Sequence, residues 1–136
     1  MDIEDAKSFM KKVEAGILAT TDGFRVGSRP MAGWAWMHNE LWCATFASSE
    51  KVEQLNEVPY AEYCFLSDEH EHLRIAGTCV VSENIDDKLA LYEAVPELKE
   101  HIADPQSEEY VVLRLKPERI RFMEKNQTGY EYIEWK

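Results

Sequence analysis

The residues best suited to chemistry lie between positions 29 and 51. The stretch Leu41–Leu55 has the pattern of a strand that runs into Ser48 and Ser49, where a helix begins. The free N–H groups at a helix start bind phosphate well. Lys51 falls in the first turn of that helix, where the helix dipole disfavours a cation. A cation in this position indicates that an anion binds nearby.

Arg29 is a second cation that the fold could bring to the same place. It lies in Ser28–Met31, and we expect this strand to pair with Leu41–Phe46 as a hairpin around Asn39. Arg29 would then lie close to Lys51, and its guanidinium fork could share a phosphate with the lysine. The residues alone leave a purely structural alternative open, in which the serine caps the helix, the lysine is solvated and the arginine pairs with a carboxylate.

Other candidate motifs are weaker. Glu69–His72 contains His70 and His72, and imidazoles with carboxylates can ligate metals. The stretch is typical of a solvated hairpin turn, so we expect no metal site there. No dinucleotide-binding, P-loop or nucleophile-elbow motif is present.

Composition limits the class of protein. The 136 residues suit one domain spanning 1–136, and a formal charge of −11 argues against nucleic acid and anionic membranes as partners. No apolar run reaches the roughly 18 residues that a membrane span needs. Cys43, Cys64 and Cys79 lie in apolar stretches without metal-ligand spacing, so we expect reduced, packed thiols and a cytoplasmic protein.

The elements that position these residues are mostly strands. Helical periodicity from Ile3 to Val13 predicts a first helix, which Gly16 ends. Short helices are expected over Ser49–Asn56 and Asp86–Ile102, the second with a break at Pro96. The predicted strands are Ile17–Thr21, Phe24–Met37, Leu41–Phe46, Tyr60–Leu66, Leu73–Ser82, Tyr110–Lys116 and Arg119–Glu124, with Tyr130–Trp135 as a last edge strand. The second of these strands is expected to be interrupted or bulged near Gly27 and Pro30, and Pro117 is expected in the turn between Tyr110–Lys116 and Arg119–Glu124. The pattern predicts a mainly β (α+β) antiparallel barrel with six or seven strands and peripheral helices.

The tryptophans of the second predicted strand follow its alternation. Trp34 and Trp36 share one face, and Arg29 and Met31 share the other. We therefore expect the two tryptophans to lie in the core or in a dimer interface rather than on the wall that carries Arg29, unless a bulge at Pro30 changes the phase.

Three runs carry a resemblance to a known family. Ile17–Thr21, Ser28–Met31 and Leu41–Val52 resemble the pyridoxamine 5'-phosphate oxidase-like family, and its general stress protein 26 branch in particular. The likeness in element order extends over roughly residues 5–125. It implies a split β-barrel homodimer that holds FMN at the subunit interface.

The resemblance also assigns roles to single residues. Arg29 would contact the FMN phosphate or ribityl chain, Pro30 and Met31 would run beside the isoalloxazine ring, Ala44 and Thr45 would lie along the flavin, and Ser49 and Lys51 would bind the phosphate. Glu50 departs from the pattern, because family members often have a basic or small residue there. Either its carboxylate turns outward or FMN binds less tightly.

The expected function is that of a flavin oxidoreductase acting on an unidentified small molecule. No side chain is assigned as acid or base, because the motif anchors a cofactor and does not identify a substrate. One alternative is a flavin-binding stress-response module without turnover. Another is a haem-binding split barrel, for which His38, His70, His72 and His101 are the available axial ligands.

Overall fold

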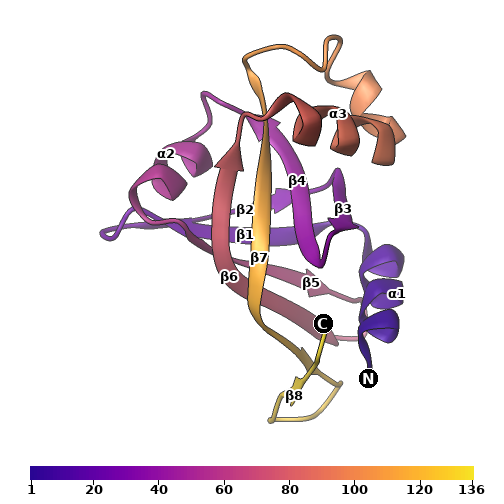
Figure 1. Cartoon of the computed structure of the whole chain (residues 1–136). Coiled ribbons are helices and arrows are strands. Elements are labelled where there is room, and N and C mark those ends of the chain that lie inside the picture. The colour runs from indigo at the N-terminus through magenta and orange to yellow at the C-terminus, as the bar shows by residue number, and fades with distance from the viewer.

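Eight antiparallel strands form one curled sheet with the order β2-β1-β5-β6-β7-β4-β3, and β8 pairs with β7 (Figure 1). The structure, a computed structural model, describes all 136 residues. The strands are β1 (Gly16–Thr21), β2 (Val26–Met31), β3 (Trp34–Met37), β4 (Glu40–Phe46), β5 (Tyr60–Leu66), β6 (His72–Ser82), β7 (Tyr110–Met123) and β8 (Glu131–Tyr132). β2 and β3 form the two edges. The predicted antiparallel split barrel is confirmed, with eight strands instead of six or seven.

Three α-helices and one 3₁₀ helix surround the sheet. They are α1 (Ile3–Val13), α2 (Glu50–Glu57), α3 (Ile85–Ala94) and the 3₁₀ helix η1 (Pro96–Glu100). The predicted helices are confirmed, including the break at Pro96, which cannot continue α3 because it lacks an N–H. No helix is long and apolar enough to cross a membrane.

The main core fills the inside of the curled sheet. Alternate residues of β5 and β6 point inward, so Tyr63, Phe65 and Ile75 are fully buried. α1 contributes Ala6 and Met10, both without exposed surface, to the same cluster. Cys43 and Cys79 are buried and all three cysteines are free, as expected from the sequence. Burial raises the pKa of the Cys79 thiol to about 12, so this thiol stays protonated at neutral pH.

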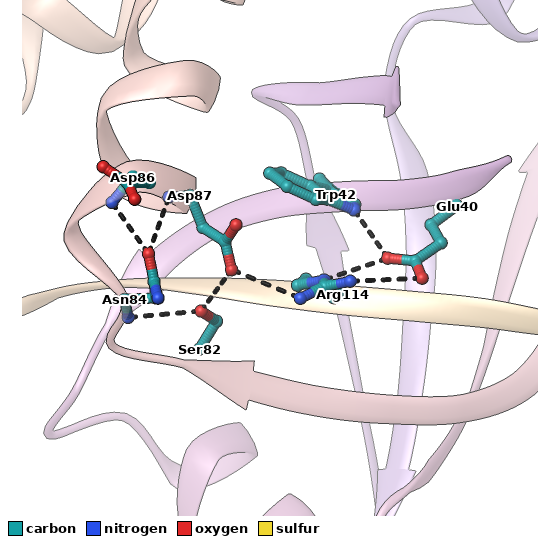
Figure 2. Close-up of polar contacts among 7 residues, drawn as sticks. All are labelled: Glu40, Trp42, Ser82, Asn84, Asp86, Asp87 and Arg114. Atoms are coloured by element: carbon teal, nitrogen blue, oxygen red, sulfur yellow. Dashed lines mark hydrogen bonds and ion pairs between the residues drawn. The ribbon is translucent and has the colours of Figure 1, made fainter. Parts of the chain in front are cut away.

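A second, smaller core lies on the outer face of β4 and β7 beneath α3. Figure 2 shows the polar contacts that hold α3 there. Arg114 of β7 binds the Glu40 carboxylate at 2.9 Å and Asp87 of α3 at 3.3 Å, and its guanidinium lies over the Trp42 ring at 5.0 Å. Asn84 caps the helix by accepting hydrogen bonds from the first-turn amides. These contacts fix the N-terminal end of α3 against β7, and through Arg114 and Glu40 against β4.

The predicted strand Phe24–Met37 is wrong. The chain leaves the sheet at Ala32–Gly33, where Gly33 has a φ of 70°, and the two halves become edge strands β2 and β3 on opposite sides of the split. The hairpin around Asn39 is confirmed, but it joins β3 to β4 and does not include Arg29.

The predicted turn at Pro117 is also wrong, because β7 runs straight through it. β7 pairs with β6 along its length, with a register shift between Ala76 and Gly77. A Cβ at Gly77 would collide with the backbone of Lys116 and lie 2.8 Å from the Glu118 nitrogen, so only glycine allows this approach. Pro117 lies at this bulge, beyond the end of the β4 ladder, where a missing N–H is tolerated.

Candidate functional site

Arg29 and Lys51 both lie beside the first turn of α2, close enough for their charges to interact, as the sequence predicted. Their proximity follows from packing of α2 on β1, the hairpin partner of β2, and not from the expected strand pairing. The Arg29 guanidinium is fixed by hydrogen bonds to β1. Its Nη1 donates to the Thr20 hydroxyl at 2.6 Å and to the Leu18 carbonyl at 3.3 Å. Its Nη2 faces Gln54 of α2 at 3.4 Å.

Lys51 is a cation without a counter-ion. Its Nζ donates to the Thr45 hydroxyl at 2.9 Å, and no carboxylate of the chain lies within ion-pair distance. Burial and the nearby Arg29 charge lower the pKa of Lys51 from its ordinary value. In a chain with 26 acidic residues, an unpaired and partly buried ammonium next to an arginine leaves room for an anion from outside the chain.

The first turn of α2 offers backbone donors to the same place. Ser49 is the N-cap residue, but its hydroxyl donates to the Phe46 carbonyl at 2.7 Å and caps no amide. The amides of Glu50 and Lys51 make no hydrogen bond within the chain. The resemblance assigns Ser49 to the phosphate, and the geometry leaves the backbone N–H groups that follow Ser49 free for that role.

Glu50 turns toward the site. Its carboxylate pairs with Arg29 Nη2 at 3.3 Å, although 71% of its side chain is exposed. It therefore occupies the same guanidinium edge that an incoming phosphate would use. Gly27 lies next to the ion pair of Arg29 and Glu50. A Cβ at position 27 would come within 2.9 Å of the Glu50 and Gln54 side-chain oxygens.

Sequence reasoning missed Thr20, Gln54 and Gly27. Gln54 lies four residues after Glu50, so helical spacing could have placed it on the same face of α2. Thr20 and Gly27 carry no sequence signal of this kind, because their role depends on how β1, β2 and α2 pack together.

A hollow of about 240 Å³ shares Thr45 with the Lys51 site, since Thr45 lines the hollow and accepts a hydrogen bond from Lys51. Ala44 and Thr45 of β4 line one side, and Leu98, His101 and Ile102 line the other. Ala32 and Gly33, which follow Met31, complete it. A small, largely apolar space that Thr45 connects to a cationic site suits a ligand with a flat ring at one end and an anionic group at the other.

Pro30 and Met31 are placed less favourably than the other predicted residues. Pro30 is exposed on the edge strand, and Met31 is only 8% exposed. The Met31 carbonyl already accepts a hydrogen bond from the Tyr63 hydroxyl at 2.6 Å. The site is therefore surrounded most closely by four of the seven predicted cofactor residues, namely Arg29, Lys51, Thr45 and Ala44.

The histidines of the acidic segment lie elsewhere. His70 lies in the β5–β6 turn with a φ of 65°, and His72 Nε2 lies 2.9 Å from the Tyr130 hydroxyl. Burial and the charges of Arg74 and Arg121 lower the pKa of His72. No group of three or more potential ligands is arranged around a metal position.

Comparison with known proteins identifies the fold and the family. The solved structures that match include a NimC/NimA family protein from Clostridium acetobutylicum (TM-score 0.82, 19% identity, 95% of this chain and 89% of that chain). General stress protein 26 from Bacillus anthracis matches with a TM-score of 0.72 and 17% identity over 93% of this chain and 98% of that chain. A pyridoxamine 5'-phosphate oxidase-related, FMN-binding protein from Nostoc punctiforme matches with a TM-score of 0.69 and 17% identity, over 95% and 86%.

Haem-binding proteins share this fold as well. No functionally curated protein has significant sequence similarity to the chain. The sequence model of the family described as pyridoxamine 5'-phosphate oxidase like matches residues 2–130, which is nearly the whole chain. This chain is therefore a member of the pyridoxamine 5'-phosphate oxidase-like family.

Proposed function

We propose that this protein binds FMN and uses it as a redox cofactor. The observation that carries the proposal is the unpaired Lys51 ammonium beside Arg29, next to free amides at the start of α2. These groups suit a phosphate, which binds cations and backbone N–H groups together. The FMN phosphate would lie in this corner, and the flavin ring would lie along Ala44 and Thr45.

The chain's own residues would bind and orient the cofactor. Thr20 and Gln54 hold the Arg29 guanidinium, and Thr45 holds the Lys51 ammonium, so both cations are positioned before the ligand arrives. FMN would supply electron transfer to and from a small molecule. No side chain at the site is assigned as a proton donor or acceptor, and the substrate and the electron donor are left open.

We further propose that the protein works as a homodimer in the cytoplasm. Apolar side chains are exposed on β1, β2 and their hairpin, with Phe24 97%, Val26 77% and Ile17 43% accessible. A second copy would cover such a surface. Sedimentation of the purified protein should give a dimer, and a clean monomer would contradict this part of the proposal.

Absorption spectroscopy of the purified protein tests the cofactor. Flavin bands that follow the protein through gel filtration would support FMN. A Soret band would favour haem, for which His101 is the available ligand because it lines the hollow beside Thr45. Absence of any chromophore, together with failure to bind added FMN, would contradict the proposal.

Reduction of the bound flavin separates an enzyme from a flavin-binding stress-response module. An oxidoreductase should be reduced by NADH or NADPH and reoxidised by an acceptor within a catalytic time. A pure binder would retain FMN and react slowly with both nucleotides.

A further inference from the structure

A larger hollow of about 760 Å³ lies on the other side of Ala32–Gly33. Its floor is β3, which lies between α1 and α3 (Figure 1). Trp34, Trp36 and Met37 line it, and we call it the tryptophan hollow. Both tryptophans are half-buried and pack against the main core on one side, so the rest of their surface faces the hollow.

The aromatic wall of the tryptophan hollow is fixed in place. The Trp34 indole N–H donates to the Glu14 carbonyl, and its ring packs edge-on against Phe65 with 5.4 Å between centroids. The Trp36 indole nitrogen is buried, so the surface that this side chain presents is carbon. Rigid aromatic surfaces bind flat, apolar rings well, because little side-chain entropy is lost on binding.

The rim of the tryptophan hollow disfavours an anionic ligand. Its ionisable residues are Glu4, Lys7, Lys11, Glu14 and Glu97, three acidic and two basic. Glu4 and Lys7 already pair with each other at 3.2 Å. Since the whole chain carries a formal charge of −11, an anionic ligand gains nothing here. With an anion disfavoured, the carbon surface of the two tryptophans suits an uncharged ring.

The tryptophan hollow adjoins the candidate cofactor site. Ala32, Gly33 and Glu97 line both this hollow and the smaller one beside Ala44 and Thr45. A ring bound against the tryptophans would therefore lie next to the place proposed for the flavin. We propose that the tryptophan hollow binds a neutral, planar aromatic substrate. Its role as a substrate site rests on the proposed FMN function, whereas the binding itself does not.

Indole N–H signals in a ¹H–¹⁵N NMR spectrum test the binding directly. The chain has 4 tryptophans, and single Trp→Phe variants would assign their indole signals. Titration with 1-naphthol, a stable neutral probe with two fused rings, should shift the Trp34 and Trp36 signals in a saturable way. Trp42 and Trp135 are internal controls outside the hollow, and their signals should stay in place.

A matched set of variants checks the site. Trp34→Leu and Trp36→Leu should each weaken 1-naphthol binding roughly tenfold, since each removes a ring contact together with buried apolar area. Trp135→Leu should change nothing, and Trp36→Phe keeps the test valid if the leucine variant unfolds. FMN content should be equal in all variants, so failure of the FMN proposal would be seen separately as a missing flavin spectrum.

Three results would overturn the inference. One is a titration in which no indole signal moves, and another is equal movement of all four signals, which means non-specific binding. The third is a shift of the Trp34 and Trp36 signals with protein concentration but not with 1-naphthol. A second copy of the chain, and not a small molecule, would then cover the hollow.

Discussion

Replacing Glu50 by glutamine should tighten FMN binding about tenfold. The carboxylate pairs with Arg29 at 3.3 Å on an exposed surface, and an exposed ion pair is worth about 0.2–1 kcal/mol, which an incoming phosphate must displace. A carboxylate roughly 4 Å from the phosphate adds about 1 kcal/mol of repulsion in water. Together these terms amount to about 1.4 kcal/mol, or a factor of about ten in the dissociation constant.

Fluorescence titration of apoprotein with FMN measures this change. Glu53→Gln is the matched control, because Glu53 is the other acidic residue in the first turn of α2 and makes no contact with Arg29. Both variants lose one favourable interaction with the helix dipole, so only the contact with the arginine differs. The gain for Glu50→Gln should shrink as salt is raised, since screening weakens exposed charges. Weaker FMN binding by Glu50→Gln would mean that Glu50 contacts the ligand directly instead of competing with it for Arg29.

Three further perturbations have defined outcomes. Because only the ammonium form of Lys51 attracts phosphate and its pKa is lowered, FMN should be released at a pH below the ordinary pKa of a lysine. Lys51→Arg should move that release to higher pH, and equal profiles of the two proteins in a pH titration would contradict this. Gly27→Ala should weaken FMN binding severalfold and change the melting temperature little, because the added Cβ would displace the flexible ends of side chains and no backbone. A large loss of thermal stability would contradict this. Arg114→Met should lower the free energy of unfolding in urea by about 2–3 kcal/mol, because it leaves the mostly buried Glu40 and Asp87 carboxylates without a cation. An unchanged urea midpoint would exclude a stabilising role for these ion pairs.

Local patterns predicted the elements well, and the errors came from long-range packing. Helix starts and stops depend on neighbouring residues, so α1, α2 and the break at Pro96 were predictable. Phe24–Met37 has strand character throughout, and nothing local indicates that Ala32–Gly33 carries the chain across the split of the barrel. Pro117 is usually a turn signal, and only its position opposite the Gly77 bulge lets a strand pass through it.

Both cations of the site were predicted from the sequence, but the strand pairing expected to bring them together does not occur. Arg29 and Lys51 lie close together as expected, but through the packing of α2 on β1. Charge type and helix position are visible in sequence, which explains why both cations could be identified. The direction of Glu50 and the support from Thr20 and Gln54 depend on side-chain placement in the folded chain, which sequence spacing does not determine.

Comparison of FMN with riboflavin shows whether Arg29, Lys51 and the first turn of α2 hold a phosphate. The two molecules differ only in the phosphate. Two charge-assisted contacts worth about 1.5–3 kcal/mol each predict that the protein prefers FMN by roughly 10²–10⁴ in dissociation constant. The Arg29→Ala, Lys51→Ala double variant should lose that preference while it keeps its fold, because the Thr20–Gln54 hydrogen bond remains. Equal affinity of the unaltered protein for FMN and riboflavin would contradict the account.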